Sequence, residues 1–201
     1  MKLTISLLRK IGLLGGECTG KTTLAHALRD HLDALVVPEY LREYVITMGR
    51  TPTELEQAGI MQTQIAAEGN ALAVTGEQTL IVCDPAALMT AIYSIAYFGD
   101  SSLLESAVQH AQTYRTLIWC GTDIPWEPDG DQRDGPAYRA QVDALIAEVV
   151  RNTLEPAGIE VHRIDGTIAQ RLQSVLRLLD HEVAVGQPKQ AWQQQRGAGG
   201  T

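Results

Sequence analysis

The sequence predicts a three-layer α/β domain, in which helices cover both faces of a parallel sheet. Three observations predict this class: five short apolar runs recur along the chain, helical patterns separate them, and a glycine-rich loop follows the first run. Strands that alternate with helices form open parallel sheets. Four of the runs show little polar alternation, as strands buried on both faces do. Ligands bind such sheets at the carboxyl ends of the strands, so functional residues are expected there.

Each expected strand is an apolar run of four or five residues, and helical patterns follow most of them. The expected strands are Ile11–Leu14, Ala34–Val37, Leu80–Cys83, Thr116–Cys120 and Glu160–Ile164. A helix over 22–31 follows the first strand, and helical spacing from Val142 to Val150 predicts another that ends at Pro156 and Gly158. The last helix is expected over about 168–181.

A further long helix is expected to open at Thr51-Pro52-Thr53-Glu54. Here Thr51 would cap the helix, Pro52 suits its first turn, and Glu54 would complete a capping box. After the last helix, residues 185–201 are rich in Gln and Gly and predict a disordered tail. The folded domain is therefore expected to be residues 1–184.

Composition excludes several classes of function. A length of 201 residues suits one domain, and a net charge of −8 argues against a nucleic-acid-binding face. No apolar stretch approaches the roughly 18 residues of a membrane span. The cysteines Cys18, Cys83 and Cys120 lack metal-type spacing, which favours buried free thiols in a reducing cytoplasm.

The glycine-rich loop has the pattern of a phosphate-binding loop. Residues 15–22, GGECTGKT, match G-x-x-x-x-G-K-[ST] completely, between an expected strand and an expected helix. The glycines let successive backbone amides point at phosphate oxygens, Lys21 would reach the β- and γ-phosphates, and Thr22 would ligate Mg²⁺. The predicted ATP-binding residues are Gly15, Gly16, Glu17, Cys18, Thr19, Gly20, Lys21, Thr22 and Thr23.

Two carboxylates follow expected strands. Asp84 comes directly after an apolar run and predicts a second Mg²⁺ ligand, although it would equally serve as a helix N-cap before Pro85. Glu39 lies just past the second strand, where it would accept a proton from an attacking hydroxyl or bind the acceptor's hydroxyls. Arg42 would neutralise charge on the transferred group. The alternative for the last two is a surface Glu–Arg pair on a helix.

The segment from Thr122 to Arg139 is too rich in Pro, Gly and Asp to be regular structure, and it is longer than a plain connection. We interpret it as a lid whose arginines, Arg133 and Arg139, close over the phosphates. Its exposed-looking Trp126 would stack on a flat ligand ring, or else pack on the core. Residues 164–171, after the last strand, give a weaker signal for contact with adenine.

With these residues in place, the chain resembles the ribosylnicotinamide kinase domain of the bacterial bifunctional NAD-biosynthesis regulator and its stand-alone relatives, among the P-loop kinases and AAA-type ATPases. The likeness spans roughly residues 11–171. It rests on GGECTGKTTL, on PEYLREYV, on the run Asp84, Thr90, Tyr93 and Tyr97-Phe98-Gly99, and on PWEPDG followed by Arg133. The resemblance implies a P-loop kinase fold with a five-stranded sheet of order 2-3-1-4-5. It also implies ATP-dependent phosphorylation of nicotinamide riboside.

One departure concerns the acceptor. Members of the family usually carry Thr directly after the strand-end Asp, whereas this chain has Pro85, Ala86 and Ala87.

Together the residues predict a kinase that uses ATP and Mg²⁺ on a small nucleoside-like substrate, with no nucleic-acid or membrane partner. Glu39, Tyr40, Asp84, Trp126 and Arg139 are the expected acceptor contacts. Two alternatives stay open: a kinase for another nucleoside or small metabolite, and an ATP-dependent switch whose output is a protein partner. The sequence gives no oligomeric state.

Overall fold

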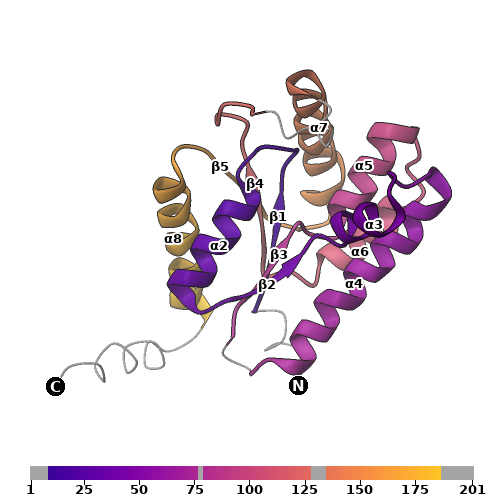
Figure 1. Ribbon diagram of the computed structural model, residues 1–201. Coiled ribbons are helices and arrows are strands. Elements are labelled where there is room, and N and C mark those ends of the chain that lie inside the picture. Colours follow the sequence, from indigo (N-terminus) through magenta and orange to yellow (C-terminus); the bar gives the residue numbers. More distant parts are fainter. Residues whose placement is uncertain (1–8, 77–78, 128–134, 187–201) are drawn as a thin grey trace.

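The fold is built on a central parallel sheet. The computed structural model describes residues 9–76, 79–127 and 135–186. In this part of the chain five parallel strands form one sheet in the order β2-β3-β1-β4-β5, with helices on both faces (Figure 1). This confirms the α/β class and the sheet order that the family resemblance implied.

The strands lie where the apolar runs predicted them, to within one residue at each end. They are β1 (Lys10–Leu14), β2 (Leu35–Pro38), β3 (Ile81–Asp84), β4 (Thr116–Cys120) and β5 (Val161–Ile164). The three inner strands, β3, β1 and β4, are buried along their whole length. That burial explains their continuous apolar sequences, because both faces are covered by helices.

Two helices cover one face of the sheet. These are α2 (Lys21–Leu32) and α8 (Ile168–Gly186), and they share a core with side chains such as Leu13 and Val82 (Figure 1). The other face is covered by α4 (Gln57–Val74), α5 (Leu88–Phe98), α6 (Leu104–Ala111) and α7 (Pro136–Val149), the last continued by a π-helical turn, η2 (Val150–Leu154). A short helix, α3 (Tyr40–Met48), follows β2 and has no buried residue.

Three elements have boundaries that differ from the prediction by two residues or more. The long helix opens two residues later than expected, because Thr53 and Glu56 form the capping box and a 3₁₀ turn, η1 (Glu54–Glu56), precedes α4. Pro136–Arg139, expected to be irregular, already form the first turn of α7. Helix α8 runs past 181 to Gly186, two residues beyond the predicted end of the domain. Residues 187–201, the rest of the predicted tail, lie outside the described residues.

The structure also tests the predictions on the cysteines and on membrane-spanning segments. Cys83 and Cys120 are buried as expected, whereas Cys18 is half-exposed. Among the described residues, no helix is both long enough and apolar enough to cross a membrane.

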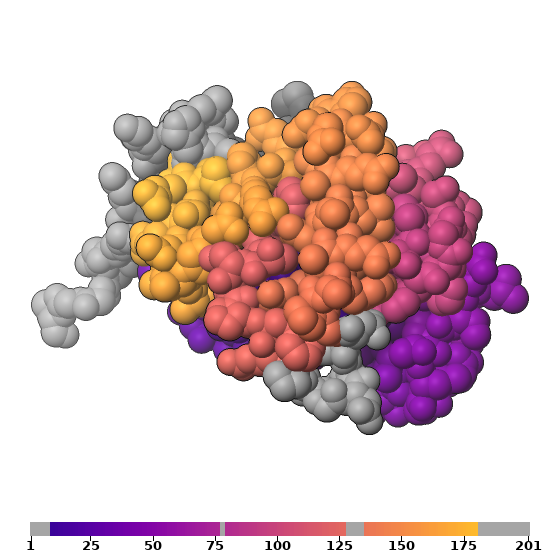
Figure 2. Space-filling view, turned by 90° about the horizontal axis from the view of Figure 1, so that it is seen from above, coloured from indigo at the N-terminus to yellow at the C-terminus, as the bar shows by residue number. Residues whose placement is uncertain are grey.

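The face above the carboxyl ends of the strands carries segments from distant parts of the sequence (Figure 2). The start of α8 and the loop after β4 lie beside each other on one side of this face, and α3 and α4 lie on the other (Figure 2). The glycine-rich loop joins β1, the central strand, to α2 and thus begins at this edge.

Candidate functional site

The backbone of the glycine-rich loop takes conformations that few side chains allow. Gly15, Cys18 and Gly20 have φ angles of 143°, 52° and 79°. A Cβ atom on Gly15 would lie 2.6 Å from Oγ1 of Thr19 and 3.0 Å from the carbonyl oxygen of Cys120. The first glycine of the motif is therefore required both by its backbone angle and by the closeness of its neighbours.

Lys21 binds the carbonyl side of this loop. Its Nζ donates to the carbonyl oxygens of Gly15 and Gly16 at 2.9 and 2.7 Å. The hydroxyl of Thr19 donates to the same Gly16 oxygen at 2.9 Å. In a trans peptide the C=O group and the next N–H group point in opposite directions, so binding these carbonyls turns the following amides the other way. Amides aimed together in this manner form an anion-binding concavity.

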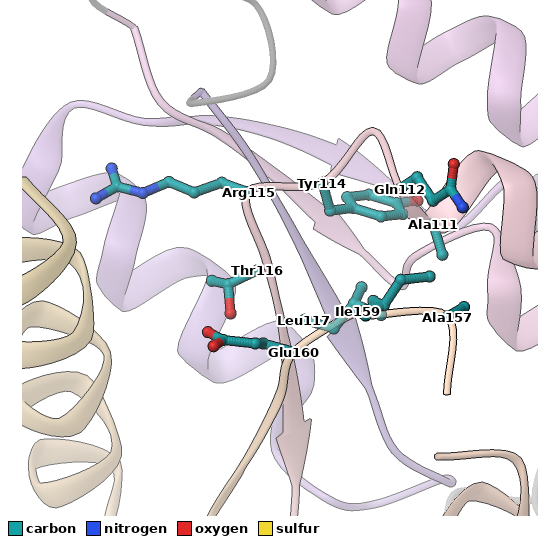
Figure 3. Close-up of a pocket in the computed structure, with 10 residues that line it drawn as sticks. Ala111, Gln112, Tyr114, Arg115, Thr116, Leu117, Ala157, Ile159 and Glu160 are labelled. Atoms are coloured by element: carbon teal, nitrogen blue, oxygen red, sulfur yellow. The ribbon is translucent and has the colours of Figure 1, made fainter. Parts of the chain in front are cut away.

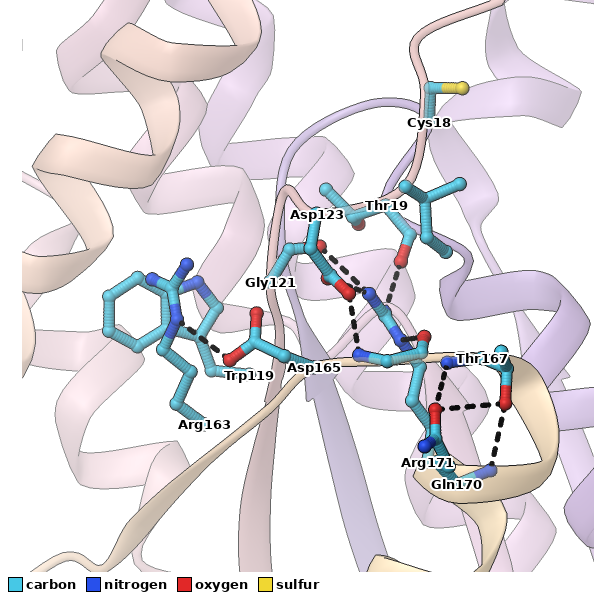
Figure 4. A network of polar contacts seen from close by, with 12 residues as sticks. Cys18, Thr19, Trp119, Gly121, Asp123, Arg163, Asp165, Thr167, Gln170 and Arg171 are labelled. Atoms are coloured by element: carbon cyan, nitrogen blue, oxygen red, sulfur yellow. Dashed lines mark hydrogen bonds and ion pairs between the residues drawn. The ribbon is translucent and has the colours of Figure 1, made fainter.

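Two arginines bind the next carbonyls of the loop. Arg139 Nη1 donates to the carbonyl oxygen of Cys18 at 3.1 Å and to that of Ile124 at 2.8 Å. Arg171 Nη1 donates to the carbonyl oxygen of Thr19 at 2.6 Å (Figure 4). Arg139 was predicted to contact a substrate, and the structure shows the contact it makes with the protein itself. Arg171 lay in a segment with only a weak sequence signal.

The carboxylate of Asp84 lies at the end of β3, next to the central strand. Its residue is 6% exposed, and the carboxylate has no hydrogen bond or ion pair with the described parts of the chain. Thr22 lies exposed in the first turn of α2. No group of three or more His, Cys, Asp or Glu side chains that could hold a metal occurs among the described residues. One nearly buried, unpaired carboxylate with a hydroxyl fits Mg²⁺, which usually takes one or two carboxylates and completes its shell with water and substrate phosphates.

Glu39 lies at the end of the neighbouring strand. The register pairs Pro38 of β2 with Asp84 of β3, so Glu39 follows directly beside the other predicted carboxylate. Its side chain is 20% exposed and accepts a hydrogen bond at 3.1 Å from Nε of Arg42, which is 68% exposed. The Glu–Arg pair of the alternative interpretation is therefore present. Its carboxylate nevertheless lies at the predicted place, between strand end and helix start.

A buried glutamine fixes this strand end. The side chain of Gln64, on α4, accepts a hydrogen bond from the N–H of Tyr40 at 2.9 Å and donates to the carbonyl oxygen of Pro38 at 3.3 Å. These two bonds bracket Glu39. The sequence offered no signal for Gln64 beyond its place in an expected long helix.

Aromatic side chains of α5 and α7 gather in one cluster, and one of them, Tyr93, feels the charge of Glu39. Tyr93 is almost buried, and burial raises its pKa well above the ordinary range, with the charges of Glu39 and Glu17 raising it further. The ring of Tyr97 lies 4.8 Å from that of Tyr138 and is 48% exposed. These rings and Phe98 form a cluster that we call the aromatic cluster: Tyr93, Tyr97, Phe98 and Tyr138.

The loop after β4 packs on the glycine-rich loop. The N–H of Glu127 donates to Sγ of Cys18 at 3.3 Å, and that thiol lies 3.6 Å from the carbonyl oxygen of Pro125. Trp126, between them, is half-buried rather than exposed, and its indole N–H has no hydrogen-bond partner among the described residues. Arg133 lies outside the described residues.

Two surface pockets lie apart from the candidate site at the carboxyl edge of the sheet. Tyr40 lines a groove of about 300 Å³ between α3 and α4 that no other predicted site residue shares. The other hollow, of about 330 Å³, is lined by Thr116, Leu117 and Glu160 at the amino ends of β4 and β5 (Figure 3). Ligands of open parallel sheets bind at the opposite, carboxyl ends.

The comparisons with known proteins agree with this geometry. Residues 10–171 match a family model described as an AAA domain. No curated protein matches the chain.

Among solved structures, NadR protein in complex with NR (nicotinamide riboside) is 18% identical, with a TM-score of 0.63 over 92% of this chain and 54% of that one. The chain thus spans about half the length of that protein. Thymidylate kinase from Candida albicans is 15% identical, with a TM-score of 0.65 over 87% of this chain and 92% of that one. Deoxyadenosine kinase from M. mycoides is 12% identical, with a TM-score of 0.61 over 86% and 99%. At these identities the likeness establishes a shared P-loop kinase fold.

Proposed function

Because the chain belongs to the AAA domain family, we propose that it is an ATP-dependent kinase that phosphorylates nicotinamide riboside to nicotinamide mononucleotide. The observation that carries the proposal is the order of the strand ends. The phosphate-binding loop follows β1, Asp84 ends the adjacent β3, and Glu39 follows β2 beyond it. A phosphate donor, a metal-binding carboxylate and a candidate base thus lie in sequence along one edge of the sheet.

The donor side of the reaction depends on positioning and charge neutralisation. The loop amides and Lys21 would hold the β- and γ-phosphates, so Lys21 would exchange its bonds to Gly15 and Gly16 for phosphate oxygens. Thr22 and Asp84 would hold Mg²⁺, which when bound neutralises charge on the β- and γ-phosphates. Arg42, exposed and adjacent to Glu39, is the predicted partner of the transferred group, together with Arg133.

The acceptor side depends on Glu39 and the aromatic side chains. A carboxylate that is mostly buried and fixed between Gln64's two hydrogen bonds suits a general base or an anchor for a ribose hydroxyl. Trp126 remains our predicted stacking partner for the nicotinamide ring. Tyr97, 48% exposed and stacked at 4.8 Å on the half-buried Tyr138, offers a second flat surface. Among the structural neighbours, NadR was solved with NR, which supports this acceptor.

A different nucleoside acceptor is the second candidate. It is favoured by Pro85, Ala86 and Ala87, which replace the Thr that the resembling family usually carries after the strand-end Asp. The structural neighbours also include a deoxyadenosine kinase, which supports a purine or pyrimidine nucleoside as the acceptor. A small-molecule partner and a cytoplasmic location remain predictions.

The experiment is a panel of nucleosides, with nicotinamide riboside included, assayed for ATP-dependent phosphorylation in the presence of Mg²⁺. We expect nicotinamide riboside to be the preferred acceptor. Lys21→Ala should abolish turnover while circular dichroism remains unchanged. Turnover of another nucleoside alone would replace the acceptor and keep the kinase. ATP binding without phosphorylation of any member of the panel would favour the switch.

A further inference from the structure

Arg171 is a fully buried arginine that no part of the proposed reaction uses. It belongs to the first turn of α8, and its side chain has no exposed surface. The start of that helix is fixed, because Gln170 accepts a hydrogen bond from the N–H of Thr167 at 2.8 Å and donates its own N–H to the hydroxyl of Thr167 at 3.4 Å. A charged side chain is buried this completely only when all of its charge is compensated.

The guanidinium reaches three different loops (Figure 4). Besides the carbonyl oxygen of Thr19 in the phosphate-binding loop, it donates to that of Gly121 at 3.2 Å, after β4, and to that of Gly166 at 2.9 Å, after β5. It also forms an ion pair with Asp123. Five N–H donors in a rigid plane make arginine the one side chain suited to such a junction.

Asp123, the ion-pair partner of Arg171, makes a second contact between the same loops. Its carboxylate also accepts a hydrogen bond from the N–H of Gly166, so it joins the loop after β4 to the loop after β5 (Figure 4). Burial acts to raise the pKa of Asp123, but the Gly166 N–H and the charge of Arg171 outweigh it and hold that pKa below its ordinary value. The pair is therefore ionised at neutral pH, and its charge-assisted bonds are stronger than neutral ones.

The order of the strands indicates which end of a nucleotide meets these loops. The acceptor carboxylates follow β3 and β2, on one side of β1. The loops after β4 and β5 lie on the other side of β1. With its phosphates in the loop after β1 and its γ-phosphate turned toward Asp84, a nucleotide must extend its base over the loops that Arg171 joins.

We propose that Arg171 is a positioning residue that couples the phosphate-binding loop to the two loops beside the nucleotide base. The coupling rests on the proposed use of ATP but not on the identity of the acceptor. By binding the Thr19 carbonyl it aims the N–H of Gly20 into the cradle, and by binding Gly121 and Gly166 it fixes the base-side loops relative to that amide. Phosphate and base would then bind to one preorganised surface instead of to two independent ones.

The test is calorimetric titration of ATP and of inorganic tripolyphosphate, which lacks the base, into the protein and its Arg171→Lys variant. Lysine keeps the charge but cannot bridge the three loops. We expect the variant to lose at least about tenfold in ATP affinity, and to lose less in tripolyphosphate affinity. In a coupled kinase assay, the KM for ATP should rise while the KM for the acceptor stays within about twofold.

Arg163→Lys is the matched control. Arg163 also forms ion pairs, with Asp143 at 3.1 Å and Asp165 at 3.5 Å, and its guanidinium stacks 4.5 Å from the centre of the Trp119 ring. It binds no atom of the phosphate-binding loop in the described structure (Figure 4). Its variant should keep the parent's ATP affinity.

Three results would overturn the proposal: equal losses for ATP and tripolyphosphate, no loss for either, or the same loss in Arg163→Lys. If Arg171→Lys does not fold, Asp123→Asn carries the test, since it keeps the side chain's shape and removes its charge; we expect the same pattern at about three- to tenfold. Because binding needs no acceptor, a parent that binds ATP yet phosphorylates no nucleoside would refute the proposed function and leave this test intact.

Discussion

Substitution of Glu68 by Gln should destabilise the protein more than any single change at the surface. Glu68 lies on α4 with no exposed surface, and its carboxylate forms an ion pair at 2.8 Å with Lys10, whose side chain is 2% exposed. The same carboxylate accepts hydrogen bonds from the Tyr114 hydroxyl at 2.7 Å and from the N–H of Ala87 at 3.2 Å, and contacts Nε2 of His110 at 2.8 Å. It thus joins the first strand to the segment that follows Asp84.

The magnitude follows from what the glutamine leaves behind. Its amide oxygen still accepts from Tyr114 and Ala87, so the main loss is the negative charge opposite Lys10. Breaking a buried ion pair by neutralising one partner costs about 3–5 kcal/mol, because the other charge stays buried without compensation. For a chain of 201 residues this lowers the melting temperature by about 6–20 °C.

The assay is urea unfolding followed by circular dichroism, with Lys10→Met/Glu68→Gln as the matched variant. The double variant removes both charges and keeps the hydrogen bonds that Tyr114 and Ala87 donate, so it should be more stable than Glu68→Gln alone. If the double variant is equally unstable or worse, the uncompensated charge is not the cause and the reasoning fails.

The same cluster predicts a dependence on pH. Burial acts to raise the pKa of Glu68, but the hydrogen bond with His110 and the charge of Lys10 outweigh it, so the pKa lies below its ordinary 4.5. A carboxyl group whose pKa is lowered by folding stabilises the folded state above the unfolded-state pKa, and this stabilisation is lost as pH falls through the folded-state value. Unfolding free energy should therefore decline below about pH 4.5 in the parent, and less steeply in Lys10→Met/Glu68→Gln.

Two further predictions concern the proposed reaction. Glu39→Gln should lower kcat by about 10²-fold with near-normal ATP affinity, the usual scale for a general base; normal turnover would make the Glu39–Arg42 pair a surface feature and leave Asp84 as the better candidate. Trp126→Ala should raise the KM for nicotinamide riboside about 5- to 30-fold, the equivalent of a lost cation–π contact of about 1–2 kcal/mol, and well above any change for ATP. Equal effects on both substrates in steady-state kinetics would mean that Trp126 only supports its loop.

The strands could be predicted from the sequence because burial on both faces leaves a continuous apolar run, as in Leu117–Cys120. The phosphate-binding loop was also predictable, since Gly15 and Gly20 of its motif have positive φ angles that favour glycine. Helix α5 was not predicted. Its sequence, LMTAIYSIAYF, is apolar on nearly every side because the helix lies between α4, α6 and α7, so it lacks the periodicity that marks a half-exposed helix.

The register of the strands in the sheet could not be predicted from the sequence either. That Pro38 pairs with Asp84 depends on how far each strand extends before its helix begins, and no local pattern states this. The predictions for Glu39 and Asp84 assumed only that both follow strands. Their position at neighbouring strand ends is the outcome of packing across the whole sheet.

The residues that hold the candidate site in shape were the hardest to predict, and the reason is their chemistry. Lys10, Glu68 and Arg171 have side chains that occur mostly at protein surfaces, so a sequence gives no cause to place them inside. Each is buried against a partner that compensates its charge or its hydrogen bonds, and that partner is distant in the chain. Arg171 binds Thr19, and Lys10 binds Glu68. A phosphate-binding loop needs amides directed to one side, and its carbonyls must then be bound on the other. In this protein cations do so at four carbonyls, and only one of the three cations, Lys21, belongs to the recognisable motif. The motif thus predicts where phosphate binds, while residues without any local signature determine how well the loop is formed to bind it.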